Sequence, residues 1–242
     1  MTGSQVWGES WFRDTGRHME MPAAWRGILT EYFAASLKLV DDADELQVLE
    51  QLLESNTPTL HSNQEDKHAQ VLAPFNFRPK HASRFRKADR SGFWYGASTL
   101  EASQSEVAYW RMVFIRDSAG LLQNELVTDH SFFQIDVAGR GIDLTTQPWS
   151  EHRKVWRNPT DYTATQALAE AAEAEHIEWM QYESVRAPQA ALAVVFTPNA
   201  LHGTTQEVNA SLQEWTCKTN RDRVVFVNRS SGAVMAWTID GD

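Results

Sequence analysis

The sequence predicts an α+β protein, in which a mixed central β-sheet follows a helical extension at the N-terminus. Segments with helical spacing of apolar residues dominate the first quarter of the chain. Short strand-like segments bounded by turn residues fill the rest, mixed with helices and without regular alternation. We expect the helical extension to cover residues 1–70 and the main domain to cover residues 71–242.

The expected extension consists of two helices and a surface segment. Residues 22–40 place apolar side chains at roughly helical spacing, and Pro22 fits a first helical turn. Residues 41–55 place four leucines on one face, with acidic residues toward the start. The polar, turn-rich residues 56–68 are expected to run over the surface.

The main domain begins with a predicted strand and helix. Residues 92–97, "GFWYGA", are typical of a short strand bounded by glycines. Residues 98–114 predict a helix, which opens with the capping-box pattern of Ser98 and Glu101.

The rest of the domain predicts one long helix among strands. The helix is expected over residues 160–180, in "TDYTATQALAEAAEAEHIEWM". The four strand-like segments are residues 130–139, 190–198, 223–231 and 233–239.

Charge and composition exclude several classes of protein. The 242 residues carry a net charge of −10, so phosphate backbones would repel the chain and direct nucleic-acid binding is not expected. A single cysteine, Cys217, excludes an internal disulfide and suits a reducing compartment. The chain shows neither a long apolar run nor a signal-peptide pattern, so we expect a soluble, cytoplasmic protein without a membrane span.

Several familiar catalytic motifs are missing from the sequence. It has no G-x-S-x-G elbow, no Walker A loop, no H-E-x-x-H and no C-x-x-C. The eight histidines are scattered and show no paired spacing typical of ligands, so we expect no metal site.

Glu106 is a candidate functional carboxylate. On the predicted helix it shares a face with Ala102 and Trp110, and no lysine or arginine lies three or four residues away. A carboxylate beside apolar groups needs a partner or serves a purpose. An ordinary surface glutamate is the alternative, and spacing alone leaves both open.

Arg84, Arg86 and Tyr95 are candidate ligand contacts. On an extended segment both arginines would point the same way, and their planar forks suit phosphate oxygens. Two solvent-exposed arginines are the alternative. Tyr95 is either a core aromatic or a stacking platform, to which the adjacent Gly96 would allow a planar ligand to approach closely.

Ser184 and Arg186 lie in "YESVRAP", which is expected to join the long helix to the next strand. Loops between scaffold elements often carry binding groups, although an ordinary polar connection is equally compatible with this composition.

Four motifs together resemble the RES domain family, which is named for an arginine, a glutamate and a serine. In order they are "SRFR", "GFWYGASTLEASQSEVAYWR", "DYTATQALAEAA" and "YESVRAP". Upstream, "LEQLLES" and "LAPFNFRP" also resemble one branch of the family, so the resemblance runs from about residue 24 to the end. Arg84, Tyr95 and Glu106 follow one another at the family's equal intervals of 11 residues.

The resemblance implies an NAD⁺ site formed by Arg84, Tyr95, Glu106 and Ser184. The commoner family form has Gly-Arg-aromatic-Asn where this chain has "SRFR", so Arg86 replaces an asparagine. Either arginine is therefore a candidate for the main NAD⁺ contact, and Arg84 ranks first.

The resemblance also implies residue roles. Arg84, with Arg86, would hold the pyrophosphate of NAD⁺, and ionised Glu106 would stabilise the positive charge that develops on the ribose. Tyr95 would stack against the nicotinamide or its ribose, and Ser184 would hydrogen-bond near that ribose or orient Glu106.

RES proteins are similar in fold to ADP-ribosyltransferase toxins and form the toxin half of bacterial type II toxin–antitoxin pairs. The resemblance implies cleavage of the nicotinamide–ribose bond of NAD⁺ as substrate, without a metal, and neutralisation by an Xre-type antitoxin that carries the DNA-binding region. Hydrolysis, phosphorolysis and protein ADP-ribosylation share this site and stay open. A non-catalytic module whose acidic surface docks a partner helix is an alternative of another class.

Overall fold

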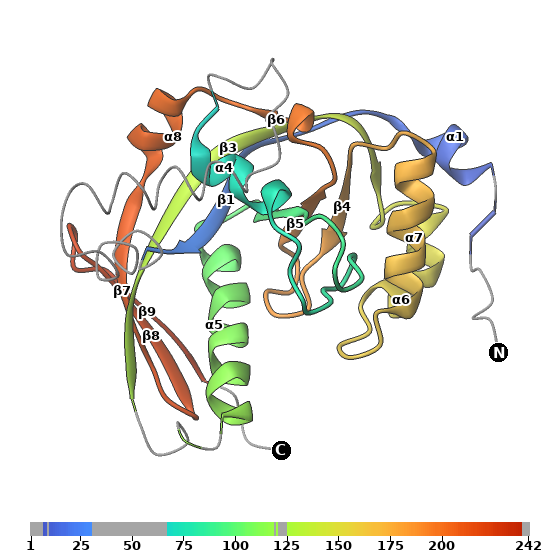
Figure 1. Ribbon diagram of the computed structural model, residues 1–242. Helices are drawn as coiled ribbons and strands as arrows, with labels where there is room; N and C mark the ends of the chain where they lie inside the picture. Colours follow the sequence, from blue (N-terminus) through green and yellow to red (C-terminus); the bar gives the residue numbers. More distant parts are fainter. Residues whose placement is uncertain (1–6, 9, 31–66, 119, 121–124, 239–242) are drawn as a thin grey trace. The chain divides into compact units, whose positions relative to one another are not determined.

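The computed structural model describes residues 7–8, 10–30, 67–118, 120 and 125–238 (Figure 1). The chain divides into two compact units. The first unit comprises the described residues of 1–26, 67–103 and 134–208, and the second comprises those of 27–66, 104–133 and 209–242.

The first unit is built on a mixed sheet. Its strands, in spatial order, are the main part of β1 (Arg17–Leu29), β2 (Trp94–Ala97), β5 (Ala191–Val195), β4 (Trp179–Glu183) and the second half of β3 (Leu126–Asp143), with the short β6 (Leu201–His202) paired to β3. β3 and β4 run parallel, whereas β5 is antiparallel to both β2 and β4. β2 and β4 therefore share a direction, so their carboxyl ends lie at the same end of the sheet. The mixed sheet confirms the predicted α+β fold class.

Several helices accompany this sheet in the first unit. They are α1 (Trp11–Thr15), α4 (Ala69–Asn76), η2 (Trp149–His152), α6 (Arg153–Trp156), α7 (Thr163–Ala174), η3 (Pro198–Ala200) and the start of α8 (Thr205–Ser211). α7 directs Leu168, Ala169 and Ala172 into a buried apolar cluster that it shares with side chains of β2, β3, β4 and β5. This burial fixes α7 against the sheet, and α6 lies beside it (Figure 1).

The second unit is an antiparallel meander with one long helix. The first half of β3 pairs with β7 (Gln213–Thr219), which pairs with β8 (Arg223–Asn228), and β8 pairs with β9 (Val234–Thr238). The helix is the main part of α5 (Leu100–Asp117). Arg111 of α5 donates to the Thr128 hydroxyl at 3.0 Å, and Arg116 donates to the Arg221 carbonyl at 2.9 Å. These bonds join α5 to β3 and to the turn between β7 and β8.

The helix predicted over residues 22–40 is wrong for residues 22–29, which belong to β1. Trp25 pairs with Ala97 of β2, and the Ala23 N–H donates to the Asp136 carboxylate at 2.7 Å. The apolar spacing there suits either period, and pairing with a neighbouring strand overrides the local preference. The predicted helix over residues 41–55 lies outside the described residues, and the boundary at residue 70 stays a prediction.

β2 and α5 confirm the strand and helix predicted after residue 92. The helix begins one residue later than the capping-box pattern indicates. Thr99, rather than Ser98, caps it, because the Thr99 hydroxyl accepts from the Ala102 N–H at 3.2 Å.

The long helix predicted over residues 160–180 ends early. α7 stops at Ala174, His176 adopts a left-handed φ of 59°, and β4 follows. Ser184 therefore follows a strand rather than a helix. The four predicted strand segments correspond to β3, β5, β8 and β9, whereas β1, β4, β6 and β7 are not predicted as strands. None of the helices in the described ranges is both long and apolar enough to cross a membrane.

Candidate active site

Residues 83–86 form a tight turn in the first unit. The Ser83 N–H donates to the Arg86 carbonyl at 2.8 Å, and the Arg86 N–H donates back to the Ser83 carbonyl at 3.3 Å. The segment is thus not extended, and the expectation that Arg84 and Arg86 point the same way is wrong. The two guanidinium groups bind different parts of the protein.

Arg84 is nearly buried, with 8% of its surface exposed. Its Nη1 donates to the carbonyls of Trp156 at 2.9 Å and Asn158 at 2.8 Å, and its guanidinium lies 4.8 Å from the ring centre of Tyr162. Its Nη2 is buried and has no hydrogen-bond partner within the described part of the chain. A buried cationic donor without a partner suits an anionic oxygen of a ligand.

Arg86 is buried in its own loop, with 3% of its surface exposed. Its Nη1 donates to the carbonyls of Pro79, Lys87 and Arg90, and its Nη2 donates to the carbonyl of His81. Backbone carbonyls of residues 79–90 therefore occupy both ends of this guanidinium. In this arrangement Arg86 stabilises the conformation of the loop by hydrogen bonds to its backbone.

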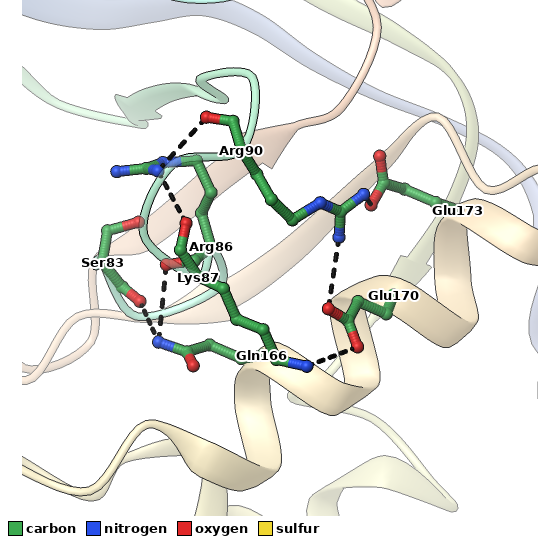
Figure 2. A network of polar contacts seen from close by, with 7 residues as sticks. All are labelled: Ser83, Arg86, Lys87, Arg90, Gln166, Glu170 and Glu173. Atoms are coloured by element: carbon green, nitrogen blue, oxygen red, sulfur yellow. Dashed lines mark hydrogen bonds and ion pairs between the residues drawn. The ribbon is translucent and has the colours of Figure 1, made fainter. Parts of the chain in front are cut away.

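The first turn of α7 binds the backbone of the arginine turn. The side-chain amide of Gln166 donates to the carbonyls of Ser83 at 2.9 Å and Arg86 at 3.4 Å (Figure 2). The hydroxyl of Thr165 donates to the carbonyl of Arg84. Two adjacent side chains of α7 thus bind three carbonyls of residues 83–86.

Ion pairs connect the same loop to the next turn of α7. Lys87 lies 2.9 Å from Glu170, and Arg90 lies 3.4 Å from Glu170 and 3.1 Å from Glu173 (Figure 2). The side chains of Lys87 and Glu170 are 53% and 38% exposed, so we assign each pair no more than about 1 kcal/mol.

Tyr95 lies on β2 beside the arginine turn. Its hydroxyl group is 2.8 Å from the Ser83 hydroxyl, and burial raises the pKa of its phenol above the ordinary value, so it stays protonated at neutral pH. A Cβ at the adjacent Gly96 would meet the Trp94 ring at 2.2 Å and the Trp25 carbonyl at 3.2 Å. The interpretation of Gly96 as room for a ligand is therefore wrong, because packing within the sheet requires this glycine.

Ser184 is completely buried and closes the turn after β4. Its hydroxyl oxygen accepts from the N–H groups of Arg186 at 3.1 Å and Ala187 at 2.8 Å. Its own N–H donates to the Ala190 carbonyl at 3.0 Å. The side chain therefore shapes the loop that leads into β5.

Glu183, immediately before Ser184, was not singled out from the sequence. Both of its carboxylate oxygens accept from Arg153 at 2.6 Å, and Arg157 lies 3.6 Å away. The hydrogen bonds from Arg153 hold the pKa of Glu183 below its usual value. No spacing rule links these residues, because 30 positions separate Glu183 from Arg153.

Glu106 is half-buried on α5, one turn after the buried Ala102 and one turn before the half-exposed Trp110. It belongs to the second unit, whereas Arg84, Tyr95 and Ser184 belong to the first. The first unit brings Arg84 and Tyr95 together through Ser83. The described residues contain no group of three or more His, Cys, Asp or Glu side chains placed to hold a metal ion.

Two comparisons with known proteins give a match, one with a family model and one with a solved structure. The family model described as the RES domain matches residues 61–220, a range that contains all five candidate residues. A solved structure, the M. tuberculosis MbcT–MbcA toxin–antitoxin complex, contains a chain that matches with a TM-score of 0.46 and 13% identity, over 86% of this chain and 87% of that chain. The curated proteins include no match to the chain.

Proposed function

This chain belongs to the RES domain family, and from that premise we propose that it is the toxin of a bacterial type II toxin–antitoxin pair that consumes NAD⁺. The proposed reaction breaks the bond between nicotinamide and ribose. The observation that carries the proposal is the guanidinium of Arg84, which is nearly buried and whose Nη2 has no hydrogen-bond partner among the described residues.

Arg84 is the proposed contact with the pyrophosphate of NAD⁺. The two carbonyls bound to Nη1 and the ring of Tyr162 hold the guanidinium in one orientation before any ligand arrives. A preorganised cationic donor loses little entropy on binding, so most of its interaction with phosphate oxygen contributes to affinity. Arg86 is a weaker candidate for this contact, because carbonyls of its own loop occupy its guanidinium.

Glu106 is the proposed catalytic carboxylate. Nicotinamide leaves as a neutral molecule, so no general acid has to protonate it. The barrier comes from the positive charge that develops on the ribose, and an ionised carboxylate stabilises such an oxocarbenium-like state. In this scheme Glu106 also hydrogen-bonds the ribose hydroxyls and activates the water or phosphate that attacks.

Tyr95 and Ser184 complete the proposed site in the first unit. The bond between the Tyr95 and Ser83 hydroxyls fixes one end of the phenol, and its ring is the proposed stacking surface for nicotinamide or its ribose. Ser184 holds the turn after β4, and we assign its hydroxyl group a hydrogen bond near the nicotinamide ribose.

Product analysis tests the reaction. The full chain, made by cell-free translation, is incubated with NAD⁺ in the presence and absence of phosphate, and product masses are measured. ADP-ribose in both samples indicates hydrolysis, and its phosphate ester in the phosphate sample alone indicates phosphorolysis. Labelled ADP-ribose on a protein band indicates transfer. Intact NAD⁺ after prolonged incubation would reject the proposal and favour a non-catalytic module that binds a partner.

An Xre-type antitoxin is the proposed partner. The net charge of −10 opposes binding of this chain to DNA, so recognition of an operator falls to the antitoxin. Co-expression with the product of a neighbouring gene for a small Xre-type protein should give a complex that retards DNA, whereas the chain alone should not. Retardation by the chain alone would contradict this division of roles.

A further inference from the structure

We propose that Gln166 is a positioning residue for Arg84, acting through the backbone of residues 83–86. The inference rests on the proposed function, because it gives Gln166 a task in NAD⁺ binding. The amide of Gln166 donates to the carbonyls of Ser83 and Arg86 (Figure 2). These two residues lie on either side of Arg84 in the sequence. One side chain thereby binds both ends of the turn that carries the arginine.

Residues at the start of α7 contact both the side chain and the backbone of Arg84. Tyr162, directly before the helix, places its ring under the guanidinium, and Thr165 binds the Arg84 carbonyl. The Thr165 hydroxyl also contacts the Tyr162 carbonyl at 3.0 Å, which links Thr165 to the residue that carries the ring. Gln166 fixes the arginine turn to this helix start, and a shift of about 1 Å in a positioned group is enough to weaken its action strongly.

The ion pairs of the same helix face contribute less to this positioning. Glu170 contacts Lys87 and Arg90 one helical turn after Gln166, and its side chain is 38% exposed. Water screens such pairs, and Glu173 also binds Arg90. Glu170 is therefore a matched control, since it lies on the same face and contacts the same loop.

The test is steady-state kinetics of Gln166→Met with NAD⁺. Methionine keeps the length, the net charge and the helix propensity of glutamine, and it removes both donors. We expect KM for NAD⁺ to rise about tenfold, because the loss of two hydrogen bonds frees the turn, while kcat stays within about twofold. Glu170→Gln should change KM by less than about twofold. An unchanged KM in Gln166→Met would overturn the inference and leave the proposed function standing.

A double-mutant cycle separates positioning from general destabilisation. If Gln166 acts through Arg84, Gln166→Met should raise KM in the wild-type background and have almost no further effect in an Arg84→Ala background. Equal effects in both backgrounds would overturn the inference.

Hydrogen exchange gives a readout that does not depend on turnover. The amides of Ser83 and Arg86 bond across the turn, so they should exchange faster in Gln166→Met than in the wild type and in Glu170→Gln. Wild-type protein that leaves NAD⁺ intact rejects the proposed function. Exchange at these two amides then still decides whether Gln166 holds the turn, and unchanged rates would overturn the inference.

Discussion

Arg153 and Glu183 form a bidentate ion pair, in which both N···O distances are 2.6 Å. The pair joins α6 to the last residue of β4 and so anchors the turn that Ser184 closes. The segment after α6 also supplies the Asn158 carbonyl that binds Arg84. One short segment thus supports both Arg84 and Ser184, which are 100 residues apart in the sequence.

Removal of the charge of Glu183 should lower stability in a pH-dependent way. The folded state depresses the pKa of Glu183, so its contribution to stability is present above the unfolded value, about pH 4.3, and is lost as pH falls through the folded pKa. We expect Glu183→Gln to lower the free energy of unfolding by about 1 kcal/mol at pH 7. Urea unfolding at pH 7 and below pH 4 measures the difference, which should shrink in acid. Glu151→Gln, at an exposed position of η2, is the control, and a difference that persists in acid would contradict the assignment.

Tyr95 should make stability fall at alkaline pH. Its folded pKa is raised, so the protonated phenol contributes stability below its unfolded pKa of about 10, and this contribution is lost as pH rises toward the folded value. In Tyr95→Phe the group that titrates is absent. We expect the wild type to lose stability relative to Tyr95→Phe between about pH 9 and 11, as measured by urea unfolding. Parallel pH dependences of the two proteins would argue against a protonated, buried phenol.

The sequence predicts well those elements whose boundaries are marked by residues within or next to the element. Residues 92–114 predict a strand and a helix because glycines bound the one and a capping-box pattern opens the other, and both exist as β2 and α5. The end of α7 was missed because "EAEHIEWM" continues a helical composition. The chain leaves the helix there through His176 in a left-handed conformation, without the glycine that usually signals such an end.

The sequence singles out the candidate residues from local spacing and from the order of four motifs, but the different contacts of Arg84 and Arg86 depend on residues that are distant in the sequence. Alternation along an extended segment does not distinguish Arg84 from Arg86, and only the resemblance to the RES family ranks Arg84 first. Their separation follows from the turn that Gln166 binds from 80 or more positions away. No local pattern encodes that contact, so the sequence left the choice of arginine open.

Glu106→Gln should nearly abolish NAD⁺ consumption. Glutamine keeps the size of glutamate and removes the negative charge that, in the proposed mechanism, stabilises the cationic ribose, so we expect kcat to fall by about 10³ or more. The same assay on Glu101→Gln gives the control, because Glu101 is exposed on the same helix α5. Thermal unfolding should show that both variants keep the fold. Equal rates for Glu106→Gln and the wild type would remove Glu106 from the proposed mechanism.

Lysine substitutions should separate Arg84 from Arg86. In Arg84→Lys one ammonium group replaces the planar guanidinium with its several donors. The lysine can then bind either the carbonyls of Trp156 and Asn158 or a ligand phosphate, but not both. We expect the affinity for NAD⁺ to fall about tenfold with little loss of stability. In Arg86→Lys buried carbonyls of the loop lose their donors, and the free energy of unfolding should fall by about 2 kcal/mol.

Calorimetric titration with NAD⁺ on the Glu106→Gln background, where the ligand should survive, measures affinity, and urea unfolding of the same proteins measures stability. Each variant is the control for the other, since both lose the arginine fork and keep the positive charge. The expected pattern is weak binding with a stable fold for Arg84→Lys, and a destabilised fold for Arg86→Lys. The reverse pattern would make Arg86 the ligand contact, because a loop-building arginine should be costly to replace even when no ligand is present.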